Sequence, residues 1–196
     1  MDIINFIQEY QILKKIPRAG WLGCSVPLNE VKTVALHTLD TAIISMLLAD
    51  LFKSKGYRID CEKVMRIALL HDLPETRIGD IPLPYKKYFG GKRNLKKFEE
   101  TVLLDMIFEF DVPLKYLELW KSRGVGIEGE IIDIADLMSI LFEQIELRNR
   151  GFKSDELDDI CKKVIGEISE LCKNYEFMGE ILKEFNKKFK DYDTYD

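Results

Sequence analysis

The sequence predicts an all-α fold in a single domain. Apolar residues recur at spacings of three and four along almost the whole 196-residue chain, and no segment shows strand-like alternation. The length fits one domain, since domains commonly run to roughly 100–200 residues. Hydrophobic residues make up 46% of the chain, which is enough for a sizeable core. We therefore expect one helical bundle over residues 1–196.

The first half of the chain is divided by glycine and proline. Asp2 is a good N-cap for the first helix, Gly56 ends the second, and Pro74 ends the third or lets it run on for one turn. The predicted helices here are 2–13, 29–53 and 61–73, with a non-helical stretch at 17–23. The predicted core stripe of the long helix is Val31, Val34, Ala35, Thr38, Ala42, Met46 and Ala49.

The second half begins with a loop that Pro82 and Pro84 enforce. Pro113 stands where a proline is best tolerated, in the first turn of a helix. No linker or repeat separates this half from the first. The predicted helices are 94–110, 113–122, 129–150, 154–173 and 178–191.

Composition and charge exclude several classes of protein. The net charge of −5 argues against binding a nucleic acid polymer, because proteins that bind one usually present a basic face. The N-terminus lacks the pattern of a signal peptide, and no apolar run approaches the ~18 residues of a membrane span. The four cysteines form no C-x-x-C pair, so we expect reduced, mostly buried thiols. A cytoplasmic protein without membrane contact is predicted.

The chain contains two histidines, His37 and His71, and both lie in strongly apolar helical segments. A lone histidine on such a helix is usually a satisfied core residue. His71 is followed at once by Asp72, however, and an aspartate is seldom buried unless it is paired or bound to metal. The doublet therefore indicates a site that carries chemistry.

A later apolar segment, residues 131–142, contains two further aspartates, Asp133 and Asp136. A carboxylate there is costly unless something positive compensates it, although one of the two could be exposed or salt-bridged. Two imidazoles and two carboxylates that converge would suit one divalent transition metal ion, such as Mn, Fe, Co, Ni or Zn. An open coordination position would then activate a water for attack on phosphorus.

The pattern His, His-Asp and Asp resembles that of the HD-domain metal phosphohydrolases, and most of all their 5′-deoxynucleotidase branch. That branch has an N-terminal arginine, a first histidine, a segment of the form His-Asp-x-x-Glu-x-x-x-x-Asp-x-Pro, and then Ala-Asp-x-Leu. The matching segments, over a motif core at 18–151, are Pro17-Arg18-Ala19-Gly20-Trp21, His37, His71-Asp72-Leu73-Pro74-Glu75-Thr76-Arg77-Ile78-Gly79-Asp80-Ile81-Pro82, and Ala135-Asp136-Leu137.

The resemblance implies an HD-type helical bundle, with helices at 154–191 packed on the motif core, and a homodimer. It implies metal ligation by His37, His71, Asp72 and Asp136, and so favours Asp136 over Asp133. It further implies Glu75 as the acid/base group, Asp80 as a nucleoside and water contact in catalysis, Arg18 as the phosphate clamp, and Lys86 as a further phosphate contact. One departure is Leu36, which stands where relatives carry an acidic residue before the first histidine.

Three functional hypotheses follow. The first is a metal-dependent phosphomonoesterase that acts on nucleoside 5′-monophosphates, preferably deoxyribonucleotides. The second is another HD phosphohydrolase, a phosphodiesterase or pyrophosphohydrolase, acting on cyclic nucleotides or nucleoside polyphosphates. The third is a non-catalytic, metal-stabilised interaction module, against which the intact Glu75 and Asp80 argue.

Overall fold

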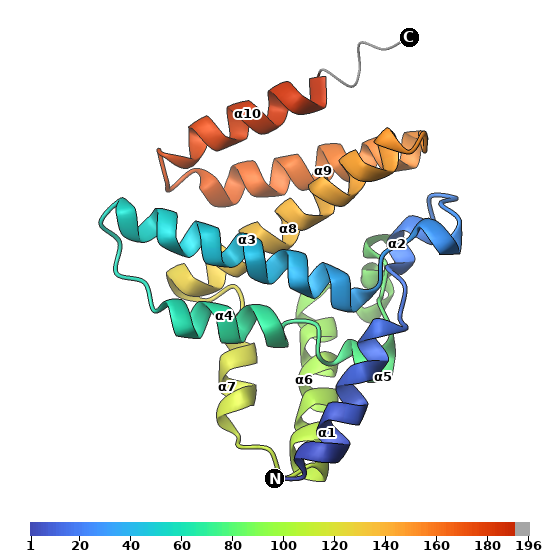
Figure 1. Ribbon diagram of the computed structural model, residues 1–196, viewed down its shortest axis with the longest axis vertical. Helices are drawn as coiled ribbons and strands as arrows, with labels where there is room; N and C mark the ends of the chain where they lie inside the picture. Colours follow the sequence, from blue (N-terminus) through green and yellow to red (C-terminus); the bar gives the residue numbers. More distant parts are fainter. Residues whose placement is uncertain (191–196) are drawn as a thin grey trace. The chain divides into compact units, whose positions relative to one another are not determined.

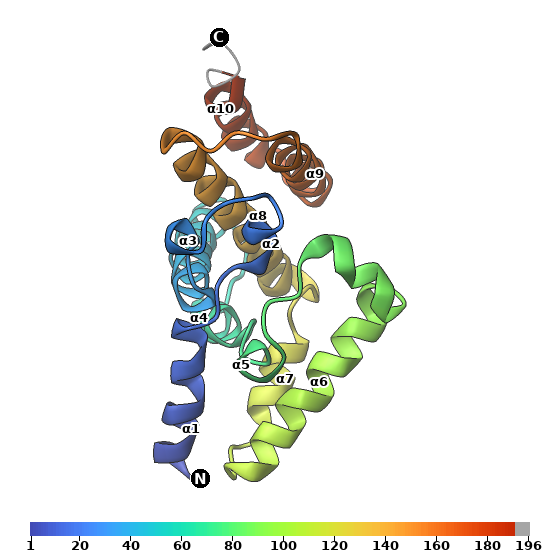
Figure 2. The same ribbon diagram turned by 90° about the vertical axis from the view of Figure 1, so that its right-hand side faces the viewer.

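The computed structural model describes residues 1–190, and they form an all-helical protein (Figures 1 and 2). Within this range the only extended pairing is an isolated antiparallel bridge between Pro17 and Thr33. The predicted all-α fold is confirmed. The helices are α1 (Ile3–Tyr10), α2 (Ala19–Leu22), α3 (Val34–Ser54), α4 (Cys61–Leu70), α5 (Glu75–Ile78), α6 (Lys92–Glu109), α7 (Lys115–Lys121), α8 (Gly126–Asn149), α9 (Asp155–Cys172) and α10 (Met178–Lys190), with 3₁₀ helices η1 (Gln11–Lys14), η2 (Leu28–Glu30) and η3 (Leu83–Phe89).

The chain divides into two compact units, one over Met1–Ala135 and one that begins at Asp136. Helix α8 starts in the first unit and ends in the second. The single domain expected from the chain length stays a prediction.

The core of the first unit joins elements that lie far apart in the sequence. Val34, in the first turn of α3, and Leu73, next to the His-Asp doublet, both belong to it. Burying a large apolar side chain stabilises the fold by roughly 1.5–3 kcal/mol, so this cluster firmly fixes the two segments that carry the predicted ligands. The buried members of the cluster are Leu13, Val34, Leu73, Leu103, Met106, Ile107, Phe110, Val112 and Trp120.

Helix α3 begins later than residue 29, the predicted start. The Thr33 hydroxyl accepts a hydrogen bond from the Leu36 N–H at 3.4 Å and so caps the helix at Val34, while η2 forms over Leu28–Glu30. The predicted core stripe is partly wrong, since Met46 is 44% exposed. The spacing of apolar residues does not identify the buried face of α3 correctly, because that face also contains polar side chains. The buried residues of α3 are Val34, His37, Thr38, Thr41, Ala42, Ser45, Leu48, Ala49 and Phe52.

Helix α3 is also long and apolar enough to cross a membrane by length and composition, with an 18-residue window of mean hydropathy 1.5. This differs from the expectation that no run approaches a membrane span. Of that window, 44% is buried inside the protein, and the helix carries the buried His37. Since the core helix of a soluble protein passes the same test, the helix is weak evidence for a membrane span.

Two stretches that the sequence predicts as loops contain short helices. Residues 19–22 form α2, whose Trp21 is buried and anchors the turn after Arg18. Residues 83–89 form η3, because a proline in the first turn of a helix loses no hydrogen bond. The prolines therefore open a helix here instead of holding a loop.

In the second unit, Ser154 caps α9 by accepting a hydrogen bond from the Leu157 N–H at 3.2 Å. Phe142 of α8 packs edge-on against Phe185 of α10, with ring centroids 5.1 Å apart. All four cysteines are free, and Cys24, Cys161 and Cys172 are buried while Cys61 is half-buried, as expected for structural thiols. The buried face of α9 consists of Leu157, Cys161, Val164, Ile168 and Cys172.

Candidate active site

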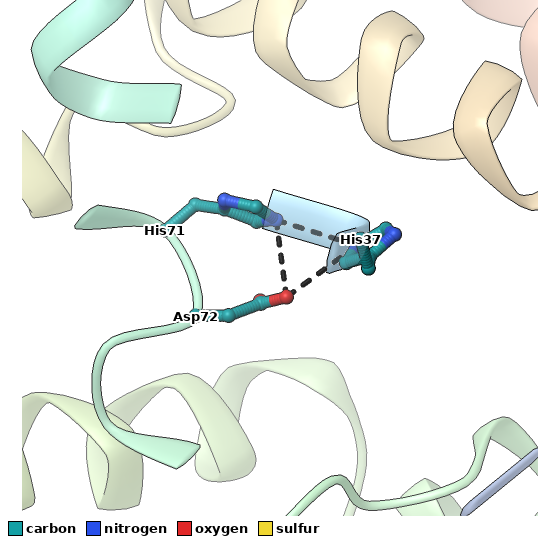
Figure 3. A group of neighbouring side chains, drawn as sticks. All are labelled: His37, His71 and Asp72. Atoms are coloured by element: carbon teal, nitrogen blue, oxygen red, sulfur yellow. Dashed lines mark hydrogen bonds and ion pairs between the residues drawn. The ribbon is translucent and has the colours of Figure 1, made fainter. Parts of the chain in front are cut away.

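Three of the four predicted metal ligands come together in the first unit, where α3 and α4 pack against each other (Figure 3). His37 lies in the first turn of α3, one turn after the capping Thr33. His71 is the C-terminal cap of α4, and Asp72 follows it in the turn before α5. All three side chains are buried, with His37 and His71 each 1% exposed and Asp72 6% exposed.

The donor atoms of these residues form a small triangle. His71 Nε2 lies 3.4 Å from His37 Nε2 and 3.1 Å from Asp72 Oδ2, and His37 Nε2 lies 3.4 Å from the same carboxylate oxygen. Figure 3 shows both imidazoles and the carboxylate pointing toward one another. Although it is buried, Asp72 Oδ2 forms no hydrogen bond with the residues that the structure describes. A buried carboxylate oxygen without a hydrogen bond, facing two imidazole nitrogens, is an arrangement that a bound cation would satisfy.

The imidazole of His71 is oriented by its own helix. His71 Nδ1 lies 2.6 Å from the carbonyl oxygen of Ala68. A carbonyl can only accept, so Nδ1 donates the hydrogen and Nε2 is left with a lone pair directed at the triangle. The backbone is held as well, because Trp120 Nε1 donates to the carbonyl of His71 at 3.0 Å. This is the arrangement in which a histidine is prepared to bind metal.

The triangle fits a divalent ion. Metal–ligand bonds of about 2.0–2.2 Å place neighbouring donors about 3.0 Å apart at right angles and about 3.4 Å apart at tetrahedral angles. The observed separations of 3.1 and 3.4 Å lie within that range. Two imidazole nitrogens and one carboxylate oxygen are also the donor types that first-row transition metals share. His37, His71 and Asp72 could therefore hold one such ion.

The charge around Asp72 favours its ionised form. Burial raises the pKa of Asp72, but the interactions with His71, His37 and Arg123 outweigh it and hold that pKa well below its usual value. A metal cation within the triangle would likewise favour the ionised carboxylate. The carboxylate is thus ready to serve as an anionic ligand.

Glu75 lies at the start of α5, three residues after Asp72. Its Oε2 atom is buried and has no hydrogen-bond partner among the described residues. Burial raises the pKa of Glu75 well above its usual value, the charges of Asp72 and Asp80 raise it further, and Arg18 and Lys86 offset part of the effect. A carboxyl group with a raised pKa beside a metal site is suited to hold and transfer a proton.

The same electrostatic neighbourhood contains the other predicted substrate contacts, since Asp80, Arg18 and Lys86 all act on Glu75. Arg18 Nη1 lies 3.5 Å from Asp80 Oδ1, and both side chains are largely buried. Arg18 is placed by backbone bonds to the strand-like stretch before α3, where the Arg18 N–H donates to Lys32 O at 2.9 Å. The backbone of Arg18 is thus hydrogen-bonded to the segment that precedes α3, the helix that carries His37.

Asp136, the predicted fourth ligand, belongs to the second unit, so the geometry of the triangle does not include it. It lies on α8, three residues after Asp133. Asp133 is engaged elsewhere, since its Oδ1 lies 3.8 Å from Arg123 Nε. Ligation by Asp136 stays a prediction.

Sequence reasoning missed two charged residues beside the site, Arg123 and Glu99. Arg123 Nη1 lies 3.7 Å from Asp72 Oδ1. Burial raises the pKa of Glu99 on α6, and its charged neighbours include Arg123, Lys86 and Asp72. Neither stands in a recognisable motif: Glu99 lies within a charged run, and Arg123 in a turn between two helices. Only the folded chain brings them to the doublet.

Comparison with known proteins finds relatives among HD-domain proteins and 5′-deoxynucleotidases. The family model of the HD domain matches residues 10–192. Human 5′-deoxynucleotidase HDDC2 is 22% identical over 170 residues, which cover 86% of this chain and 79% of the human protein. The 5′-deoxynucleotidase YfbR of Salmonella typhi is 26% identical over 136 residues, which cover 63% of this chain and 66% of that protein.

Solved structures share the fold. A conserved hypothetical protein from Pyrococcus furiosus superposes with a TM-score of 0.79 at 32% identity, covering 94% of this chain and 99% of that one. An HD-domain phosphohydrolase from Listeria innocua superposes with a TM-score of 0.73 at 22% identity, covering 94% and 90% of the two chains. With the match over residues 10–192, the chain belongs to the HD-domain family and is a hydrolase of that family.

Proposed function

We propose that the protein is a metal-dependent phosphomonoesterase that hydrolyses nucleoside 5′-monophosphates, with deoxyribonucleotides preferred. The observation that carries the proposal is the donor triangle of His37, His71 and Asp72 beside the carboxyl group of Glu75, whose pKa is raised by burial and by the charge of Asp72. A purely structural metal site needs ligands but no proton-transfer group next to them. Relatives named 5′-deoxynucleotidases support the substrate class.

We propose that His37, His71 and Asp72 hold a divalent transition metal, namely Mn, Co, Fe, Ni or Zn. The Ala135-Asp136-x-Leu motif supports Asp136 as the fourth ligand. When bound, the ion supplies Lewis acidity toward a water molecule and a phosphoryl oxygen. Hydrolysis of the ester P–O bond then yields inorganic phosphate and the free nucleoside.

Each remaining residue has a role that its chemistry supports. Glu75 gives a proton to the nucleoside oxygen that leaves phosphorus, since its raised pKa keeps the carboxyl protonated closer to neutral pH. Arg18 offers a planar fork of donors that suits phosphate, and Lys86 adds a second positive charge that acts on Glu75. Asp80, paired with Arg18, accepts from hydroxyl groups on the sugar side.

The test is phosphate release from four substrates in the presence of Mn or Co. The substrates are a deoxynucleoside 5′-monophosphate, its ribo counterpart, a nucleoside 3′-monophosphate and a cyclic nucleotide. The proposal requires the 5′-deoxy compound to give the highest kcat/KM. Faster hydrolysis of the cyclic nucleotide would identify a phosphodiesterase, and no hydrolysis of any of the four would favour a non-catalytic module. The family resemblance also supports a homodimer, which sedimentation of the purified protein tests.

A further inference from the structure

The turn between α7 and α8 brings a guanidinium group behind the His-Asp doublet. Arg123 Nη1 lies 3.7 Å from Asp72 Oδ1 and donates to the carbonyl oxygen of His71 at 3.4 Å. The other carboxylate oxygen, Asp72 Oδ2, faces the two imidazoles. The two oxygens of Asp72 therefore have different partners: one faces Arg123 and the other faces the proposed metal position.

This turn is held in a defined conformation. Trp120 donates to the same His71 carbonyl, and Lys96 Nζ donates to the carbonyl oxygen of Arg123 at 2.9 Å. The first turn of α8 also packs tightly on it, because a Cβ at Gly129 would lie 2.2 Å from the carbonyl oxygen of Ser122. The backbone of Arg123 is thus fixed from both α6 and α8.

A positive charge this close to a cation site would weaken metal binding if nothing balanced it. Asp133 supplies the balance, since its Oδ1 lies 3.8 Å from Arg123 Nε. Asp72, Arg123 and Asp133 form a chain of alternating charge in which the guanidinium contacts a carboxylate on each side. Arg123 can then orient Asp72 with little net repulsion of a bound ion.

We propose that Arg123 is a positioning residue of the metal centre, which holds Asp72 Oδ1 so that Oδ2 stays directed at the metal, with Asp133 as its counter-charge. This role rests on the proposed metal site. It assigns a function to Asp133 other than ligation, and it makes the α7–α8 turn part of the centre. Residues that orient a metal ligand in this way usually contribute about 10–100-fold to metal affinity.

The test is calorimetric titration of the metal-stripped protein with Mn, comparing the wild type with Arg123→Met and Asp133→Asn. Arg123→Met should bind Mn about 10–100-fold more weakly, since Asp72 loses its anchor. Asp133→Asn should also weaken Mn binding, because the positive charge of Arg123 is then no longer compensated by a carboxylate. In the double variant with Arg123→Met, the Asp133→Asn substitution should have a smaller effect on Mn affinity. The matched control is Arg66→Met, which breaks an exposed pair with Glu62 and should leave the dissociation constant unchanged.

Thermal melting separates positioning from plain structural support. A positioning role predicts that Arg123→Met reduces the rise in melting temperature that Mn causes, whereas structural support alone lowers the metal-free and metal-loaded values equally. If Arg123→Met does not fold, Arg123→Lys replaces it; a lysine keeps the charge but lacks the fork, so a smaller loss of affinity is expected. Wild-type affinity in the folded variant would overturn the role of Arg123, and absence of Mn binding by the wild type would overturn the metal site itself.

Discussion

Replacing Glu75 by glutamine should raise the stability of the metal-free protein while it abolishes most of the activity. Burial and the charges of Asp72 and Asp80 raise the pKa of Glu75 above its usual value of 4.5. The folded chain therefore binds a proton at pH values where the unfolded chain has released it. Since the folded state then carries more protons, the free energy of unfolding falls as the pH rises from 4.5 through the raised pKa.

The size of the effect follows from linkage. Each unit by which the folded pKa exceeds the unfolded one lowers the free energy of unfolding by about 1.4 kcal/mol once the pH is above both. Glutamine keeps the shape and carries no charge, so the substitution removes the repulsion by the charges of Asp72 and Asp80. We therefore expect Glu75→Gln to gain on the order of 1 kcal/mol at neutral pH and to gain nothing where Glu75 is protonated.

Turnover should change in the opposite direction. An amide cannot exchange a proton at neutral pH, and general acid/base catalysis contributes about 10²–10⁴-fold to rate. This loss corresponds to about 2.7–5.5 kcal/mol of transition-state stabilisation. Metal affinity should be retained, because Glu75 is not a member of the donor triangle.

The assay is urea unfolding of chelator-treated protein from acid to neutral pH, together with phosphate release by the metal-loaded protein. Glu118→Gln is the control, because Glu118 is an exposed glutamate on α7 outside the site. The reasoning fails if Glu75→Gln has near-normal turnover, or if its stability relative to wild type does not increase with pH.

Other substitutions test the remaining residues of the site. His71→Ala should lose metal in elemental analysis, and with it the stabilisation of about 2.7 kcal/mol that an ion at about 100 times its dissociation constant provides; unchanged metal content would exclude the site. Asp136→Asn should abolish activity and weaken metal binding more than Asp133→Asn does, and the reverse order would show that the ligand is misassigned. Arg18→Ala should lower kcat/KM for a nucleoside monophosphate by about 10²–10³-fold in steady-state kinetics, since charge develops on the phosphate. Asp80→Ala should impair nucleotides more than a simple phosphate ester, and equal effects on both would remove its contact with the sugar.

Much of this site is readable in the sequence because its residues are local. The ten positions from His71 to Asp80 contain two predicted metal ligands, the acid/base candidate and the predicted sugar contact, so a short local segment determines their placement. The rarity of histidine made His37 a candidate without knowledge of the fold. The packing of α3 on α4, which brings it to His71, follows from buried residues on both helices.

Other features depended on contacts between distant segments. The buried face of α3 includes Thr41 and Ser45, so counting apolar residues could not find it. Arg123 reaches Asp72 across 51 positions through a turn whose shape depends on Gly129 and Lys96. The helix at Ala19–Leu22 forms although Gly20 disfavours it, since the burial of Trp21 outweighs local propensity.

The most direct test of metal-dependent phosphomonoester hydrolysis is a titration of chelator-treated protein with Mn or Co. Bound metal and phosphate release from a mixture of deoxynucleoside 5′-monophosphates are recorded at each step. We predict no release without metal, a rise in rate in proportion to the metal bound, and saturation at one ion per chain. Phosphate release that is unchanged by chelation, or metal that binds at His37, His71 and Asp72 without producing any activity, would contradict the account.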